Sequence, residues 1–157
     1  MEHIISVLVE NRFGVLAHIA GLFSGRGFNI DSLAVGETHD PSISRMTIVV
    51  RGDDNVVEQI LKQLNRLVDV ISVQDLSQAS HLERELMLVK VESNAQSRSQ
   101  IVEISNIFRA KIVSVQQDTL TIEAAGSSEK LQALLDMLNT YGIRELVRTG
   151  RIALARG

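Results

Sequence analysis

The sequence contains no cysteine and no tryptophan, and it has only one tyrosine and one proline. Without cysteine, the chain forms no disulfide, holds no metal through a thiolate and has no cysteine nucleophile. With so few aromatic rings, the hydrophobic core must be built from aliphatic side chains, and 45% of the residues are hydrophobic. The missing thiols fit the reducing cytoplasm, which is the location we expect.

Excess basic charge and long apolar runs are also missing. The formal net charge is −3 and the pI about 5.8, whereas a nucleic-acid binder usually has a basic balance. No apolar run approaches the length of about 18 residues that a membrane-spanning helix needs. The N-terminal residues MEHIISVLVE lack the basic region of a signal peptide. We therefore expect no nucleic-acid partner and no membrane partner.

An internal repeat is present in the sequence. The segment MTIVVRGDDNVVEQILKQLN, residues 46–65, aligns without gaps with LTIEAAGSSEKLQALLDMLN, residues 120–139. Each copy predicts a strand, a glycine turn, an acidic or hydroxyl-bearing helix cap and an amphipathic helix. The first half has about eleven additional residues between its second and third strands, within GETHDPSISR, residues 36–45.

Hydrophobic periodicity predicts the order βαββαβ in each half. In the first half we expect strands at 4–9, 28–36, 45–51 and 70–76, and helices at 15–24 and 55–67. In the second half we expect strands at 86–91, 112–116, 120–124 and 143–149, and helices at 99–109 and 129–139. This order predicts an α+β fold of two tandem ferredoxin-like domains, residues 1–77 and 78–157, with a polar linker at 77–85.

The second strand of a ferredoxin-like domain lies at an edge of its sheet. In the first half this edge strand, Asn29–Gly36, has Ile30, Leu33 and Val35 and no lysine or proline. An apolar edge strand is able to pair with another chain. We therefore predict a homodimer in which Asn29–Gly36 pairs with its twin.

The segment VENRFGVLAHIAGLFSGRGFNI, residues 9–30, contains the candidate binding site. Gly14 precedes a predicted helix, whose first N–H groups are free to bind an anion. Gly14 has no side chain, so a small ligand has close access to the backbone. Asn11 and Asn29 each provide a donor and an acceptor. These features indicate a pocket for a small zwitterion with an aliphatic tail, although Asn11 could instead cap the helix or shape the turn.

Other motifs favour structural roles. Gly25 and Gly27 follow the helix, the reverse of the order in a phosphate-binding loop, so we expect a helix cap and a turn. The four histidines are scattered and predict no metal site. The RNA-binding version of this fold needs aromatic residues on its central strands, and ISVLVE and MTIVVRG have none.

The segment NRFGVLAHIAGLFSGRGFNIDSL resembles the ACT-domain signature, with the pattern Asn-x-x-Gly-x-Leu at the helix mouth. The segments DPSISRMTIVVRGD, LVDVISV and ERELMLVKV resemble the regulatory (small) subunit of acetolactate synthase, also called acetohydroxyacid synthase (AHAS). The resemblance covers nearly the whole chain and is most specific over residues 4–92. One departure is Phe13, where many members have proline.

The resemblance implies a noncatalytic subunit without cofactors of its own. Its partner would be the catalytic (large) subunit, which carries thiamine diphosphate, FAD and magnesium. It also implies feedback inhibition by valine, or sometimes leucine or isoleucine, bound between two ACT domains. The implied effector-binding residues are Asn11, Gly14, Val15 and Leu16 from one chain, with Asn29, Ile30 and Asp31 from its partner.

The sequence is also compatible with two other functions. The chain could be a free-standing ACT-type amino-acid sensor that regulates another enzyme. It could also be a small hydrolase on the ferredoxin-like scaffold, such as an acyl phosphatase, in which Arg12 and Asn29 would act on a phosphate.

Overall fold

A computed structural model describes residues 1–24 and 28–157. The expected cap at Gly25 and turn at Gly27 lie outside the described residues. The first half contains β1 (Glu2–Glu10), α1 (Val15–Ser24), β2 (Asn29–Glu37), β3 (Ile43–Arg51), α2 (Asp54–Arg66) and β4 (Val70–Asp75). The second half contains β5 (His81–Glu92), α3 (Arg98–Ile107), β6 (Lys111–Val115), β7 (Thr119–Gly126), α4 (Ser128–Leu138), a 3₁₀ turn at Asn139–Tyr141, β8 (Ile143–Arg148) and β9 (Ile152–Ala155). The predicted pair of ferredoxin-like domains is confirmed.

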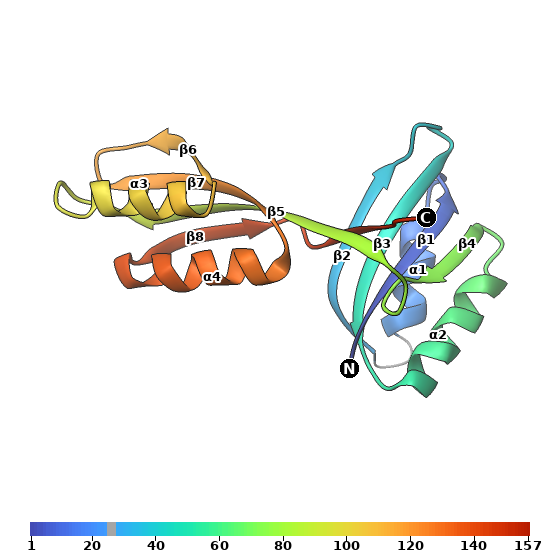
Figure 1. Cartoon of the computed structure of the whole chain (residues 1–157). Helices are drawn as coiled ribbons and strands as arrows, with labels where there is room; N and C mark the ends of the chain where they lie inside the picture. Colours follow the sequence, from blue (N-terminus) through green and yellow to red (C-terminus); the bar gives the residue numbers. More distant parts are fainter. Residues whose placement is uncertain (25–27) are drawn as a thin grey trace. The chain divides into compact units, whose positions relative to one another are not determined.

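The first sheet has the strand order β2-β3-β1-β4, and all its pairs are antiparallel. Helices α1 and α2 pack on one face of it (Figure 1). The sequence correctly predicts that β1 is central, because its nearly continuous apolar run is buried on both faces. It also correctly predicts that β2 is an edge strand.

Local sequence signals explain where the helices of the repeat begin. Asp53 caps α2, since its carboxylate accepts a hydrogen bond from the backbone N–H of Val56 at 2.9 Å. Ser127 caps α4 in the same way, and its hydroxyl accepts from the N–H of Lys130 at 3.3 Å. The aligned residues therefore perform the same structural task in both halves.

The second sheet has the corresponding order β6-β7-β5-β8. Helices α3 and α4 cover one face of it (Figure 1). Its core contains Met87, Val89 and Val91 from β5 and Leu131 and Leu134 from α4, all of them fully buried. The core is aliphatic, as the scarcity of aromatic residues predicts.

The chain divides into two compact units at positions that differ from the sequence repeat. Unit 1 contains residues 1–82 and 151–157, and unit 2 contains residues 83–150. The expectation of a polar linker over residues 77–85 was wrong at its C-terminal end, because β5 already begins at His81. The first residues of β5 have the polar composition of a loop, but they form a strand because β5 pairs with β9.

Strand β9 has no counterpart in the first half and was not predicted. It belongs to unit 1, where Ala153 is buried in a cluster with Ile4, Val49 and Leu76. This cluster lies on the sheet face opposite α1 and α2, since Ile5, Val7 and Val50 belong to the other core. A four-residue strand has too little periodicity to be recognised.

An ion pair holds β9 to the first strand of unit 1. Arg151 donates to both carboxylate oxygens of Glu2, at 2.7 and 2.8 Å. These hydrogen bonds lower the pKa of Glu2 below its usual value of 4.5. A carboxylate with a lowered folded-state pKa stabilises the fold above its unfolded pKa, and this contribution is lost as the pH falls through the folded value.

We therefore predict a pH-dependent effect of Arg151→Gln. At pH 7 the variant should lose about 0.5–1 kcal/mol of unfolding free energy, a small value because Glu2 is partly exposed and screened by solvent. At a pH well below the folded-state pKa of Glu2, both proteins carry a protonated Glu2, and the difference should disappear. Urea denaturation at the two pH values measures this, and an equal loss at both would contradict the ion-pair explanation.

Candidate functional site

The loop between β1 and α1 forms the mouth of the candidate site. Gly14 has a φ of +87°, a left-handed conformation that favours glycine. A Cβ built on Gly14 would meet no heavy atom within 4 Å, apart from its chain neighbours. The first helical hydrogen bond of α1 runs from the N–H of His18 to the carbonyl of Gly14, at 3.0 Å. The helix mouth is thus open beside Gly14, and the amides of Leu16 and Ala17 precede this first hydrogen bond.

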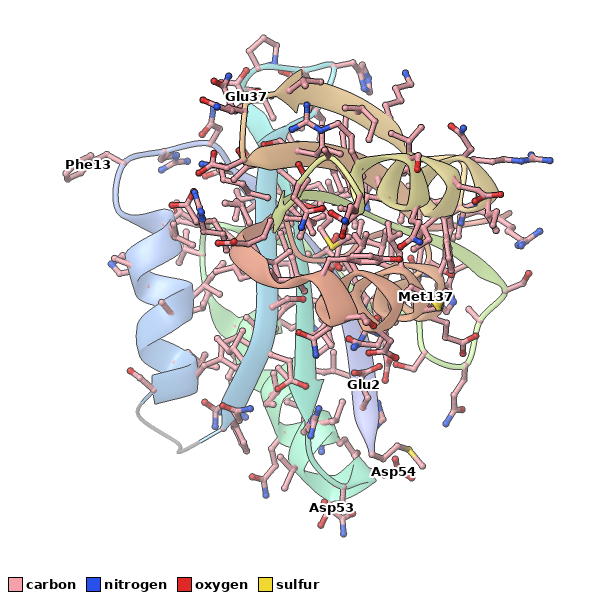
Figure 2. The ribbon with its side chains drawn as sticks, turned by 90° about the vertical axis from the view of Figure 1, so that its left-hand side faces the viewer. Glu2, Phe13, Glu37, Asp53, Asp54 and Met137 are labelled. Atoms are coloured by element: carbon pink, nitrogen blue, oxygen red, sulfur yellow. The ribbon has the colours of Figure 1, made fainter. Side chains whose placement is uncertain are left out.

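The two residues after Gly14 face different surroundings. Val15 is buried against the core of unit 1, whereas Leu16 is 47% exposed. Phe13, on the other side of Gly14, is fully exposed and points away from the ribbon (Figure 2). Val15 therefore anchors the helix, while Leu16 offers an aliphatic surface to a ligand or another chain.

Asn11 connects this loop to the hairpin between β2 and β3. Its side-chain Nδ2 donates to the carbonyl of Pro41 at 2.9 Å and to the carboxylate of Glu37 at 3.2 Å. Its backbone N–H donates to the carbonyl of Ser42 at 2.7 Å. The Asn11 amide therefore holds two loops together and does not cap α1, and its Oδ1 acceptor takes part in none of these bonds.

The second group of candidate residues begins β2. Asn29 donates to the carboxylate of Asp31 at 2.7 Å, and Arg51 on β3 donates to the other oxygen of the same carboxylate at 2.7 Å. Ile30 is partly buried against the core. The pairing of β2 with β3 shifts register between Ile30 and Ser32, so Asp31 lies at an irregularity in the edge strand.

Within one chain the two groups lie at opposite ends of the sheet. Asn29 pairs with Arg51, which pairs in turn with Glu2 at the start of β1. Asn11 instead follows the end of β1, where Glu10 pairs with Ile43. Figure 2 shows Glu2 and Glu37 at these two ends. A nine-residue strand separates the groups by roughly 25–30 Å. A single chain therefore does not assemble all seven candidate residues around one ligand.

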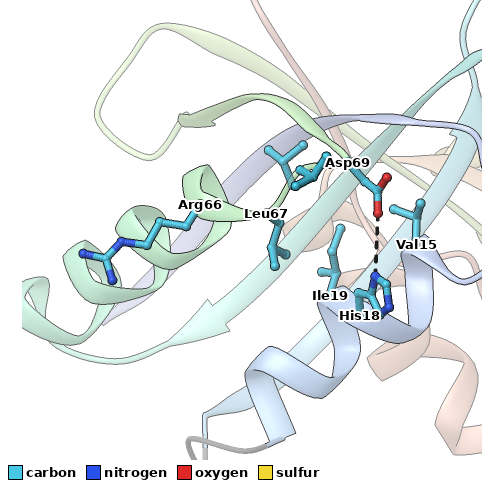
Figure 3. Close-up of a pocket in the computed structure, with 8 residues that line it drawn as sticks. Val15, His18, Ile19, Arg66, Leu67 and Asp69 are labelled. Atoms are coloured by element: carbon cyan, nitrogen blue, oxygen red, sulfur yellow. Dashed lines mark ion pairs between the residues drawn. The ribbon is translucent and has the colours of Figure 1, made fainter.

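A cavity of about 270 Å³ lies on the other side of the helix mouth (Figure 3). Its lining residues are Val15, His18, Ile19, Arg66, Leu67, Val68, Asp69 and Val70. His18 Nδ1 lies 3.6 Å from a carboxylate oxygen of Asp69, and Arg12 lies 3.9 Å from the other. Of the candidate residues, only Val15 contributes to this cavity.

Sequence reasoning did not identify the partners of Asn11, which are Glu37, Pro41 and Ser42. The additional length of residues 36–45 and the single proline mark this segment as unusual in the sequence. Neither feature indicates that the segment contacts Asn11. In the described parts of the chain, no cluster of three or more His, Asp or Glu side chains could hold a metal ion. No helix among the described residues is long and apolar enough to cross a membrane.

Two family models match the chain. The model of the AHAS small subunit-like ACT domain matches residues 5–72, and the model of the small subunit of acetolactate synthase matches residues 84–157. A probable acetolactate synthase small subunit from Archaeoglobus fulgidus is 54% identical, over 100% of this chain and 98% of that protein. One from Methanothermobacter thermautotrophicus is 55% identical, over 99% of this chain and 93% of that protein.

A solved structure agrees with these matches. The crystal structure of the acetolactate synthase small subunit from Thermotoga maritima has a TM-score of 0.92 and 39% sequence identity, over 100% of this chain and 98% of that one. The resemblance that the loop and strand motifs indicate is thereby confirmed. The chain belongs to the acetolactate synthase small-subunit family, and its first half is an ACT domain of that family.

Proposed function

We propose that this chain is the noncatalytic regulatory subunit of an acetolactate synthase, in the biosynthesis of valine, leucine and isoleucine. It activates a catalytic subunit, which carries thiamine diphosphate, FAD and magnesium, and it mediates feedback inhibition by valine. The small-subunit name of its full-length relatives supports the pairing with a larger subunit. The observation that carries the effector assignment is the open helix mouth at Gly14.

Valine matches the chemistry of this mouth. Its carboxylate would accept hydrogen bonds from the backbone N–H groups near Gly14–Leu16, where the helix dipole also favours an anion. Its ammonium would donate to the Oδ1 of Asn11, which the hairpin bonds do not use. Its isopropyl group would pack on Leu16, which is half exposed.

The remaining residues would come from a second copy of the chain. A two-fold axis near Leu33, the middle of β2, pairs this strand antiparallel with its twin. That arrangement places the Asn29 end of one β2 beside the Glu37 end of the other, which is the end that Asn11 contacts. Asn29, Ile30 and Asp31 of one protomer would then lie near Gly14 of its partner. Backbone pairing at the edge supplies the hydrogen bonds.

Inhibition requires valine to bind one arrangement of the dimer, or of its complex, more tightly than another. A coupling free energy of about 1–3 kcal/mol is typical of such systems. Valine at the dimer interface contacts both protomers, so it changes their relative geometry or their docking on the catalytic subunit.

Two alternative functions have less support. A free-standing ACT sensor needs no second domain, whereas residues 84–157 match the C-terminal family model of the small subunit. A pull-down without a thiamine-dependent partner would favour the sensor. A hydrolase of the acyl phosphatase type needs Arg12 and Asn29 on one phosphate, but they lie at opposite ends of the sheet, and Arg12 pairs with Glu10.

We predict that valine binding requires the β2 edge. Val35 is 46% exposed on this strand, and Val35→Lys places a charge where the twin strand would pack. The variant should become monomeric and lose valine binding. The matched control is Val113→Lys, which places the same charge at the edge strand of unit 2, where Val113 is 50% exposed.

The test is calorimetric titration of valine, leucine and isoleucine into the wild-type protein and both variants, with the mass in solution measured in parallel. We expect wild type and Val113→Lys to be dimeric and to bind valine. A monomeric Val35→Lys that binds valine normally would rule out a site shared between protomers. Failure of all three amino acids to bind the wild type would rule out the effector assignment.

A further inference from the structure

The β2–β3 hairpin has a length that the fold does not require. In unit 2 the equivalent strands β6 and β7 are joined by residues 116–118, and Gln116 donates to Thr119 to close the turn. In unit 1, β2 and β3 each have nine residues and are joined by the hairpin loop, residues 38–42. Because unit 2 forms the same fold without this extension, the extension needs a different explanation.

The hairpin loop is ordered by its own hydrogen bonds. The carboxylate of Asp40 accepts from the backbone N–H of Ser42 at 3.0 Å and from its hydroxyl at 2.7 Å. The N–H of Ile43 donates to the carbonyl of Asp40 at 2.9 Å, and the N–H of Thr38 donates to that of Ile43 at 2.9 Å. The bonds from Ser42 lower the pKa of Asp40, which is therefore ionised at neutral pH. A rigid loop loses little conformational entropy when it binds a partner.

The hairpin forms one wall of a cavity of about 430 Å³. Its floor contains Leu8 and Ile43, which are half buried, and Arg45, whose guanidinium donates to Ser6 at 2.7 Å. The wall is residues 37–40, and His39 and Asp40 are exposed at its rim. The floor is aliphatic at Leu8 and Ile43, while the guanidinium of Arg45 is held by Ser6, and the carboxylate of Asp40 lies at the rim. The cavity therefore suits an apolar side chain with hydrogen-bond donors beside it.

The hairpin is also bonded to the loop that we assign to the effector. Asn11 alone makes three hydrogen bonds to it, through Glu37, Pro41 and Ser42. A side-chain amide is planar, so a ligand that binds Oδ1 of Asn11 also fixes the direction in which Nδ2 donates. A surface that transmits regulation must respond to the effector, and this bonded contact provides a physical route.

We propose that the β2–β3 hairpin of unit 1 is the surface that binds the catalytic subunit, and that Asn11 couples it to the effector site. The catalytic subunit places an aliphatic side chain on Leu8 and Ile43 and presents donors to Asp40. This inference rests on the proposed function, since it takes the catalytic subunit as the partner.

The test uses the full chain reconstituted with its catalytic subunit. His39→Lys adds a positive charge beside Asp40 at the exposed rim, which opposes the donors that the partner presents there, and Ile43→Ser removes part of the apolar floor. The matched control is Gln117→Lys, at an exposed position in the equivalent turn of unit 2. For each protein we measure the concentration that gives half-maximal activation, the valine affinity of the free chain, and its mass in solution.

We expect both hairpin variants to need about tenfold more protein for half-maximal activation, the effect of losing one interface anchor. Their valine affinity and mass should match the wild type, and Gln117→Lys should change nothing. Activation by both hairpin variants at wild-type concentrations would overturn the inference, as would a change in mass, which would make the hairpin a contact between copies. If valine fails to bind the wild type, the effector assignment fails, while the activation data still test the hairpin.

Discussion

Gly14→Asp should reduce the affinity for valine by at least about a hundredfold and abolish feedback inhibition. The new carboxylate would lie where the carboxylate of valine is expected to bind. Two like charges about 4 Å apart near a protein surface repel each other by roughly 4 kcal/mol, and each 1.4 kcal/mol changes affinity about tenfold. Activation by the valine-free protein should persist, because the substitution opposes only the effector.

The fold should tolerate this substitution. The Cβ position of Gly14 is open, so no neighbour has to move. The φ of +87° imposes a strain of about 1–2 kcal/mol on a residue with a side chain. Urea denaturation of the variant checks that this strain leaves unit 1 folded.

Gly14→Asn is the matched control for charge. Asparagine has almost the same size as aspartate and also tolerates a positive φ, but it is neutral. We expect it to weaken valine binding by about tenfold or less. Calorimetry on both variants separates the two effects, and an unchanged valine affinity in Gly14→Asp would show that the site is elsewhere. Equal losses in both variants would show that shape, and not charge, excludes the ligand.

Ala153→Glu should destabilise unit 1 by about 2–4 kcal/mol. Ala153 is only 6% exposed and packs with Ile4, Val49 and Leu76 on the outer face of the first sheet. A carboxylate at this position must either lose its hydration in an apolar cluster or force β9 away from the sheet. Detachment would also remove the contacts that Arg151 makes with Glu2.

An exposed neighbour of Ala153 provides the control, and the tyrosine of unit 2 provides a separate probe of that unit. Leu154→Glu makes the same change at the neighbouring position, which is 54% exposed, and should alter stability by less than about 0.5 kcal/mol. Tyr141 is the only tyrosine and lies in unit 2, so its fluorescence follows that unit alone. We expect Ala153→Glu to lower the urea midpoint measured by circular dichroism and to leave the Tyr141 transition in place. A coincident shift of both signals would show that the units unfold together.

The local structure was largely predictable from the sequence. Helix α1 has the predicted bounds, Val15–Ser24, because its apolar spacing and the glycines on either side are local signals. The apolar run of β1 predicted a strand buried on both faces, and the internal repeat predicted the second unit from the first. The bounds of most other elements differ from the prediction by one or two residues, since strand ends depend on partners and not on composition.

The candidate site was predictable only in part. The position of Gly14 at the mouth of α1 followed from its place before a predicted helix, and the structure adds its positive φ and the open space around its Cβ position. The partners of Asn11 did not follow, because Glu37 and Pro41 are far from it in sequence and approach it only when β2 and β3 align with β1. The irregular pairing at Asp31 likewise depends on how two strands meet.

The sequence by itself determined the family, the repeated βαββαβ order and the mouth of α1, since caps, glycines and hydrophobic periodicity act over a few residues. Only the tertiary structure decided which residues share an end of the sheet. It separated Asn11 from Asn29 within one chain, joined Asn11 to the hairpin, and placed β9 on unit 1. These outcomes depend on strand order and register, which are set by packing along the whole chain and not by any single segment.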